Sequence, residues 1–290
     1  MTTATKILFT SNIWQCTAKV QLCVAHSEGT WIVTDTTPFH PVSHIWPDHP
    51  ADRGFITVVN QDYAVINCLV GAVELASQTL YVADAIPVRR DTEGWVFVVV
   101  HHLAQDLMLE IGQEVELSVD KAYQQALGRG HSGGHLSSLA LNKVLHHDFW
   151  RKDAPRKDEL GHYDFHSYAQ EKSEVSEDCS RDTYRLGKTL RKRGLNSADM
   201  LEQLNDIADK INQQLTQWLE LESAITMRCE GQALTDSRYW CCDLKEGNVI
   251  EIPCGGTHSQ SLAEYNQLWV EFEYVNDQQI VMYTRAIKRQ

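Results

Sequence analysis

Two short motifs in this chain each place two metal-binding side chains four residues apart. The sequence HSGGH carries His131 and His135, and the sequence CGGTH carries Cys254 and His258. The apolar run that follows the first motif has helical spacing, so both imidazoles lie on one helical face. The glycines of the second motif allow its thiolate and imidazole to fold inward. Three imidazoles and a thiolate suit zinc better than magnesium or calcium, so we expect one zinc ion per chain.

These motifs indicate the zinc ligands more clearly than they indicate the type of zinc site. A metalloprotease is excluded, because its HExxH motif needs a glutamate where this chain has Ser132. Four protein ligands are typical of a closed structural zinc, whereas a hydrolytic site keeps one position open. Three alternatives remain: a five-coordinate metal, one candidate outside the ligand shell, or a zinc ion that only shapes the pocket.

The motifs resemble a known family. HSGGHLSSLAL followed at a distance by CGGTH is similar to the editing domain of alanyl-tRNA synthetases and to the free-standing AlaX-type trans-editing deacylases. The segment GQEVELSVD resembles the family's last barrel strand before the histidine helix. The segment TPFHP followed by DRG resembles the family's TxFYP…DxG motif. The resemblance implies a zinc-dependent enzyme that hydrolyses mischarged tRNA of the Ser- or Gly-tRNA(Ala) type, with aminoacyl-tRNA as its partner.

Residues next to the four ligands are candidates for the chemistry of ester hydrolysis. Ser132 and Thr257 each adjoin a ligand and are placed to hydrogen-bond the substrate. Gly255 and Gly256 would offer backbone N–H groups to a developing oxyanion. We therefore expect these four residues to position the substrate.

The loop of residues 40–52 departs from the family pattern. In the family this loop is glycine-rich, lies over the active site and contributes to tRNA recognition. Here its middle, VSHIWPD, contains no glycine. We expect this loop to set substrate choice, through His40, His44, Trp46, His49 and Asp52.

Composition and charge bound the class of protein. The chain has 290 residues, 43% of them hydrophobic and 22% charged, which is typical of a soluble globular protein. Its net charge of -13 argues against a general nucleic-acid or DNA binder. No apolar run is long enough for a transmembrane helix, and no signal peptide is recognisable. Eight cysteines without scaffold spacing fit reduced thiols, so we expect a cytoplasmic protein, and Cys241 and Cys242 are expected to pack from a strand. No feature of the sequence specifies an oligomeric state.

One basic run interrupts this acidic chain. Residues 181–193 hold six basic side chains against Asp182. The run is either a solvated helix face or a contact to tRNA phosphates. The phosphate-contact hypothesis names Arg185, Lys188, Arg191, Lys192 and Arg193.

The pattern of elements predicts an α+β fold in two domains. Many short strands, beginning with Ile7–Phe9, predict a small antiparallel β-barrel over residues 1–120. Residues 121–290 are predicted to form an α+β domain with helices packed on an antiparallel sheet, and the resemblance implies that this is the editing domain. Its helices are expected from His131 to about His147 and, after an N-cap at Ser197, along an apolar stripe that ends near residue 222.

The second HxxxH pair, His162 and His166, has a different expected setting. Its centre, Tyr163–Phe165, is predicted to be extended, so packing or surface exposure is favoured over metal binding. His101 and His102 end a hydrophobic strand and are expected to be structural.

Two other functions remain open beside tRNA editing. The altered loop and the charge of -13 favour a hydrolase of small esters or amides on the same scaffold. A non-catalytic tRNA or protein binder with a structural zinc is the second alternative.

Overall fold

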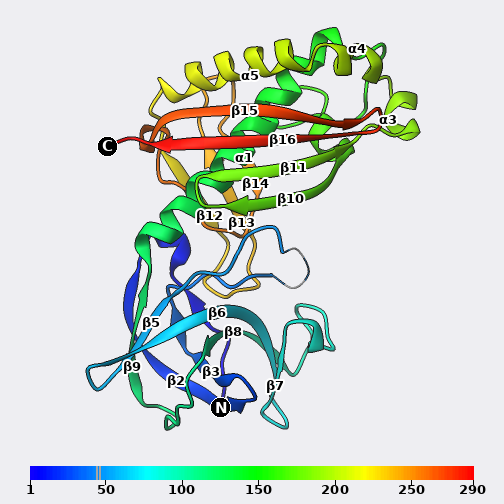
Figure 1. Cartoon of the computed structure of the whole chain (residues 1–290). Helices are drawn as coiled ribbons and strands as arrows, with labels where there is room; N and C mark the ends of the chain where they lie inside the picture. Colours follow the sequence, from blue (N-terminus) through cyan, green and yellow to red (C-terminus); the bar gives the residue numbers. More distant parts are fainter. Residues whose placement is uncertain (44, 46) are drawn as a thin grey trace. The chain divides into compact units, whose positions relative to one another are not determined.

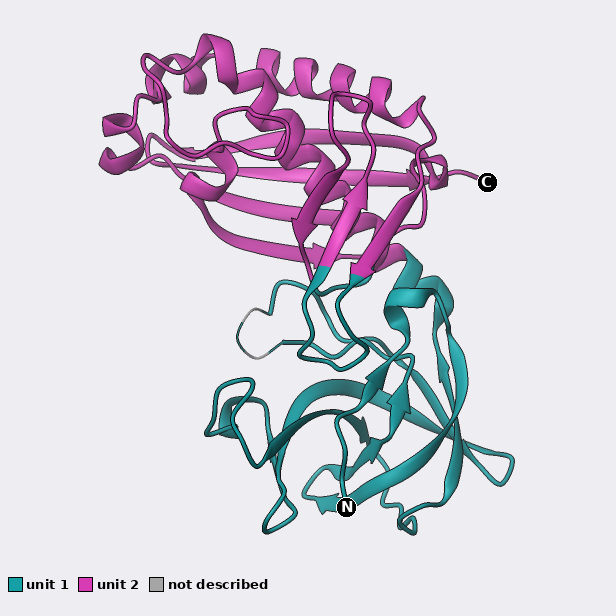
Figure 2. Cartoon of the chain, turned by 180° about the vertical axis from the view of Figure 1, so that it is seen from behind, with its two compact units in different colours: residues 1–125, 229–238, 255–257 teal, residues 126–228, 239–254, 258–290 magenta. Residues whose placement is uncertain are grey.

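The computed structural model describes residues 1–43, 45 and 47–290, so His44 and Trp46 lie outside the described residues. The chain is a mixed α+β protein, which confirms the predicted fold class. It divides into two compact units (Figure 2): unit 1 comprises residues 1–125, 229–238 and 255–257, and unit 2 comprises residues 126–228, 239–254 and 258–290. No helix within the described ranges is long and apolar enough to span a membrane.

Unit 1 is built on a closed ring of antiparallel strands (Figure 1). The strands in ring order are β5 (Gly54–Val58), β9 (Glu114–Val119), β2 (Gln15–His26), β3 (Gly29–Thr34), β8 (Trp95–Leu103) and β6 (Gln61–Glu74). Pairing of β6 with β5 closes the ring. Strand β7 (Thr79–Val82) extends the sheet from β6, and a short 3-10 helix follows it at Ala83–Ala85.

Alternation of side chains explains how the ring encloses a core. In β9, Val115, Leu117 and Val119 are buried, while Glu114 and Glu116 between them are exposed. Successive side chains of a strand point to opposite faces, so one face of the sheet fills the interior. This arrangement agrees with the antiparallel barrel predicted for this part of the chain.

The first predicted strand is wrong beyond Ile7. Strand β1 (Lys6–Ile7) pairs in parallel with β4 (Thr36–Thr37), and Phe9–Ser11 then form a 3-10 helix. Asn12 ends that helix in the left-handed conformation, with φ of 57°. The chain therefore turns where the apolar residues alone suggested an extended segment.

Unit 2 contains a four-stranded antiparallel sheet and most of a smaller three-stranded one. The larger sheet has the order β10 (Gln170–Ser176), β11 (Cys179–Arg185), β16 (Gln279–Lys288), β15 (Tyr265–Asn276). The smaller has the order β12 (Ile225–Cys229), β13 (Arg238–Cys242), β14 (Ile250–Pro253). The helices are α1 (Lys121–Asp148), which begins in unit 1, α2 (Phe165–Ala169), α3 (Lys188–Lys192), α4 (Ser197–Glu202) and α5 (Leu204–Leu219), with a 3-10 turn at Leu262–Glu264.

Helix α5 packs along strand β15, as Figure 1 shows. Its predicted apolar stripe is confirmed as core: the buried residues are Leu204, Ile207, Ile211, Leu215, Trp218 and Leu219. The side chain of Asn212 adds a polar clamp, because it accepts a hydrogen bond from Val270 N at 2.7 Å and donates one to Val270 O at 3.2 Å. The helix is thereby fixed against the outer strand of the sheet.

Three predicted features of the helices differ from the structure. Helix α1 begins at Lys121 rather than His131, since Asp120 accepts a hydrogen bond from Tyr123 N at 3.1 Å. The segment predicted as extended turns into α2, where Asp164 is the N-cap and accepts from Ser167 N at 3.0 Å. Ser197 is the first residue of α4 and not a cap.

Candidate metal centre

Helix α1 carries the first two candidate ligands through a crowded part of unit 2. A side chain at Gly130 would come within 2.5 Å of Ser176 O, and one at Gly128 within 2.8 Å of the carbonyl carbon of His258. Real Cβ atoms do not approach backbone atoms this closely. The glycines therefore let α1 lie directly against the β10–β11 turn and the segment that carries His258.

The second pair reaches the same place from strand β14. Pro253 ends this strand in register with Tyr239 of β13, and Cys254 follows at once. Ser259 N donates to Gly128 O at 3.3 Å, which ties the residue after His258 to α1. Residues distant in sequence thus meet through one strand end and one helix.

All four predicted ligands converge within unit 2. The ligand atoms of His131, His135, Cys254 and His258 lie within 4.8 Å of one another. Cys254 Sγ lies 3.3 Å from His131 Nε2, and the rings of His131 and His258 stack with centroids 4.3 Å apart. A tetrahedral zinc with Zn–S of about 2.3 Å and Zn–N of about 2.0 Å separates such atoms by roughly 3.6 Å. The donor set and its spacing therefore fit a zinc ion.

Burial prepares one of the histidines, His135, for metal binding. Burial lowers the pKa of His135, although the nearby Cys254 opposes this shift. A lowered pKa keeps the imidazole neutral at pH 7, and the neutral form is the one that ligates a metal. Trp240, which is fully buried, lies beside His135 with ring centroids 5.3 Å apart.

A chain of hydroxyl groups supports the far side of His258. Ser132 Oγ lies 3.1 Å from His258 Nδ1 and accepts a hydrogen bond from Ser259 N at 3.2 Å. Ser259 Oγ lies 2.7 Å from the hydroxyl of Tyr265, which donates to Arg129 O at 3.0 Å. Ser132 is fully buried, so its hydroxyl orients a candidate ligand.

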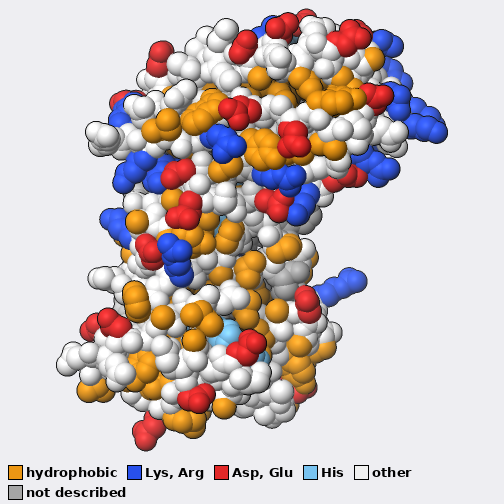
Figure 3. All heavy atoms as spheres, in the orientation of Figure 1, with side chains coloured by type: hydrophobic (Ala, Val, Ile, Leu, Met, Phe, Trp, Pro, Cys, Tyr) orange, Lys and Arg blue, Asp and Glu red, His pale blue; other side chains and the backbone are white. Residues whose placement is uncertain are grey.

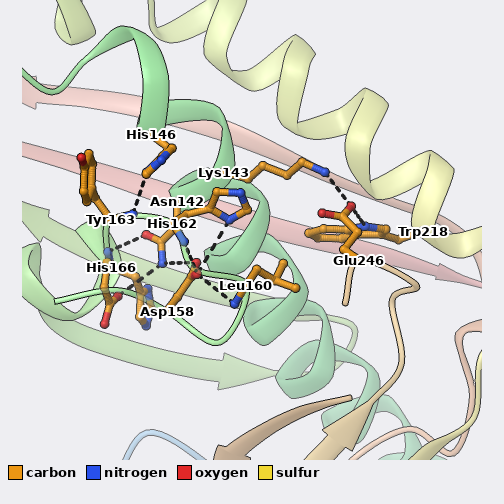
Figure 4. Close-up of polar contacts among 11 residues, drawn as sticks. Asn142, Lys143, His146, Asp158, Leu160, His162, Tyr163, His166, Trp218 and Glu246 are labelled. Carbon is orange, nitrogen blue, oxygen red and sulfur yellow. Dashed lines mark hydrogen bonds and ion pairs between the residues drawn. The ribbon is translucent and has the colours of Figure 1, made fainter. Parts of the chain in front are cut away.

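The second HxxxH pair belongs to a separate polar network (Figure 4). His166 Nδ1 lies 2.9 Å from the hydroxyl of Tyr184, whereas His162 Nδ1 lies 3.7 Å from a carboxylate oxygen of Asp158. Asn142 of α1 donates to Asp158 at 3.0 Å and accepts from His166 N at 3.0 Å. These contacts attach the 158–166 segment to α1, so packing accounts for this pair.

Unit 1 holds a second group of possible metal ligands that the sequence analysis did not identify. The ligand atoms of His26, Glu28 and His102 lie within 4.8 Å of one another. His102 Nε2 lies 3.2 Å from Glu28 O, and the ring of His26 stacks on Trp31 at 4.2 Å. Packing at the β2–β3 turn accounts for this arrangement. His102 reaches the turn because strand β8 pairs with β3.

The ends of the 40–52 loop are held by Asp52. Its Oδ2 accepts hydrogen bonds from His40 N at 2.7 Å and from Gln124 Nε2 at 2.5 Å, while its Oδ1 is buried without a hydrogen-bond partner among the described residues. Burial raises the pKa of Asp52 to about 7. His49 Nε2 lies 2.9 Å from Thr257 Oγ1, and the rings of His40 and His49 are 4.4 Å apart. Gly255, Gly256 and Thr257 are grouped with this loop in unit 1.

The basic run lies in two different settings. Arg185 ends β11 and pairs with Glu171 at 3.3 Å. Lys188, Arg191 and Lys192 lie on α3, and the guanidinium of Arg193 lies 4.2 Å above the ring of Tyr168. The run is therefore not one helix face. Cys241 and Cys242 are buried in β13, as predicted.

Fold and site together define a class: an α+β protein whose candidate metal centre combines three imidazoles and one thiolate. No protein-family model matches the chain. The chain is 25% identical over 191 residues to the alanyl-tRNA editing protein AlaX-M of Pyrococcus horikoshii, and the aligned stretch covers 66% of this chain and 68% of that protein. This similarity supports a relationship with alanyl-tRNA editing proteins.

Proposed function

We propose that this protein is a zinc-dependent trans-editing hydrolase that deacylates mischarged tRNA of the Ser- or Gly-tRNA(Ala) type. The observation that carries the proposal is the convergence of His131, His135, Cys254 and His258, whose ligand atoms lie within 4.8 Å of one another. The similarity to AlaX-M supports aminoacyl-tRNA as the substrate class. One zinc ion per chain is expected.

The reaction suits this donor set. Aminoacyl-tRNA carries an activated ester, so hydrolysis needs a positioned water and a stabilised oxyanion. A bound zinc would supply an activated water and a polarised carbonyl. Ser132 would hold the ring of His258 in the orientation that ligation needs, through the 3.1 Å contact at Nδ1.

Substrate contacts are assigned to the segment between Cys254 and His258. The backbone N–H groups of Gly255 and Gly256 are proposed to stabilise the oxyanion. Thr257 is proposed to hydrogen-bond the substrate through the same hydroxyl that lies 2.9 Å from His49 Nε2. The proposal therefore couples His49 to substrate binding.

Free cysteines throughout the described chain support a cytoplasmic location.

A second candidate function is a non-catalytic binder with a structural zinc. The set of four protein side chains favours it, because closed sites of this kind are usually structural. Under this alternative the ion would stabilise unit 2 without contributing to hydrolysis.

Deacylation of a panel of charged tRNAs separates these functions. Seryl-, glycyl- and alanyl-tRNA(Ala) and a small model ester would be incubated with the protein as purified, after chelation, and after return of zinc. We expect loss of serine or glycine, retention of alanine, and dependence on zinc. A zinc-loaded protein that cleaves none of them would support the structural alternative, and cleavage of the small ester alone would support the small-ester hydrolase.

A further inference from the structure

Two basic segments that are separate in sequence meet at one end of unit 2. The first, residues 151–157, follows α1, and the second, residues 188–193, contains α3. Arg151 N donates to Gly194 O at 2.8 Å, and Asn196 N donates to Phe149 O at 2.7 Å. Figure 3 shows Lys and Arg side chains gathered over the end of the unit where Figure 1 places α3.

Two cavities open where these segments meet. One, of about 680 Å³, is lined by both segments and by α2, with Arg156, Ser167, Tyr168, Thr189 and Arg193 among its walls. The other, of about 350 Å³, is lined by Arg151, Lys152, Arg191, Lys192, Asn196 and Ser197. Both combine cationic side chains with polar groups that can donate hydrogen bonds, and such mixtures are used to bind phosphate oxygens.

Tyr168 connects the two basic segments. Its hydroxyl accepts a hydrogen bond from Arg156 N at 2.9 Å, and its ring lies 4.2 Å below the guanidinium of Arg193. Asp164 fixes Arg156 from the other side, through a 2.8 Å ion pair with Nε. Two arginines of the larger cavity are therefore held in defined positions before any ligand arrives.

Most basic side chains of the two segments form no ion pair with a described carboxylate. Arg151, Lys152, Lys188, Arg191 and Lys192 form no ion pair within the part of the chain that the structure describes. Elsewhere in unit 2 the pattern differs, since Arg181, Arg228 and Arg285 each pair with a glutamate. Five cationic side chains that form no ion pair with a described residue repel one another, so an external anion is the partner that this surface suits.

We propose that residues 151–157 and 188–193, with Tyr168 between them, form a binding surface for the phosphodiester backbone of tRNA. Two adjoining cation-lined cavities match successive phosphates of one strand better than a single free phosphate. The chain as a whole has a net charge of -13, so these segments form a local basic patch on an acidic protein. The identity of the ligand rests on the proposed function, because tRNA is the polyanion that an aminoacyl-tRNA hydrolase must hold.

The distance to the candidate metal centre is compatible with this ligand. Helix α1 carries His135 near the centre and ends at Asp148, just before the first basic segment. At 1.5 Å per residue, these two positions are about 20 Å apart along the helix axis. A tRNA whose 3′ end enters the centre would have phosphates of its acceptor arm at such a distance.

The test measures binding of uncharged tRNA by fluorescence anisotropy over a range of salt concentrations. The test variant carries Arg151→Gln, Lys152→Gln, Arg191→Gln and Lys192→Gln, all at exposed positions. The control carries Lys210→Gln, Arg228→Gln, Lys245→Gln and Arg285→Gln, which change the net charge equally but lie in carboxylate pairs. We expect the test variant to bind at least tenfold more weakly than the control and to lower the salt slope by roughly 3.

Uncharged tRNA keeps this test independent of catalysis. If both variants bind tRNA equally, or if the wild-type protein binds none, the proposal is overturned. If tRNA binding depends on this surface but the protein deacylates no tRNA, the binding surface is supported and the proposed function is rejected. A second pair of variants tests the geometry: Tyr168→Ala should weaken binding more than Tyr168→Phe, which keeps the ring beneath Arg193, and equal effects would contradict the role given to that ring.

Discussion

Cys254 Sγ lies 3.3 Å from His131 Nε2, although 123 residues separate them in the sequence. One atom comes from the end of strand β14 and the other from helix α1. Their separation is close to the edge of a tetrahedral zinc site, about 3.6 Å. The relative position of this strand end and this helix therefore determines whether a metal can bind.

Gly128→Ala should weaken metal binding without unfolding the protein. The added methyl group would lie 2.8 Å from the carbonyl carbon of His258, so the segment carrying this ligand must move. Alanine itself favours helix by about 1 kcal/mol over glycine, which offsets part of the strain. We expect zinc affinity, measured by chelator competition, to fall at least tenfold.

The matched control for this change is Gly134→Ala on the same helix. Its methyl group would meet only the side chain of Ser180, at 3.0 Å. A similar loss of zinc affinity in both variants would show that helix packing in general, and not the position of His258, controls the site.

Ser132→Ala should lower zinc affinity by roughly ten- to a hundredfold, the usual effect of removing a group that orients a ligand. Its hydroxyl contacts His258 Nδ1 at 3.1 Å and accepts from Ser259 N. Ser137→Ala is the control, because that buried hydroxyl has no hydrogen-bond partner among the described residues. Unchanged affinity in Ser132→Ala would show that this hydroxyl is not needed to orient His258 for metal binding.

Each pair of candidate ligands could be predicted from the sequence because its two residues lie four positions apart, but the meeting of the two pairs depends on tertiary structure. Histidines four residues apart on a helix share a face whatever the tertiary structure, and the CGGTH segment closes on itself. The α5 stripe was predictable for the same reason. The 3-10 helix at Phe9–Ser11 and helix α2 were not, because they depend on single capping and left-handed residues in short segments.

Features made by long-range packing could not be predicted. Residues 151–157 are joined to residues 188–194 only through tertiary contacts, such as the hydrogen bond from Arg151 N to Gly194 O. The hydrogen bonding of the Asp52 carboxylate likewise depends on Gln124, which lies near the start of α1. Sequence patterns show which residues are charged, but burial and the neighbours that burial brings depend on the whole fold.

Asp52 should make stability fall as pH rises. Burial raises its folded pKa to about 7 from its ordinary value of 3.8, so between these values the native carboxyl holds a proton that the unfolded chain releases. The unfolded state then binds fewer protons, and the free energy of unfolding decreases with pH until about pH 7. Asp52→Asn removes this dependence.

Urea unfolding of both proteins at pH 5 and pH 8 measures the effect. The stability of the wild-type protein relative to Asp52→Asn should drop by on the order of 2 to 3 kcal/mol between these pH values. A constant difference would mean that Asp52 is ionised in the folded protein throughout this range.

The most direct test of the metal centre is elemental analysis of the purified protein together with three cysteine variants. We predict about one zinc per chain in the wild-type protein, and in Cys241→Ala and Cys242→Ala, whose thiols lie in β13 outside the four-residue group. Cys254→Ala should lose most of its zinc, because the thiolate ligand is removed. A fully folded wild-type protein without metal, or a Cys242→Ala variant that empties the site while Cys254→Ala retains zinc, would contradict the account.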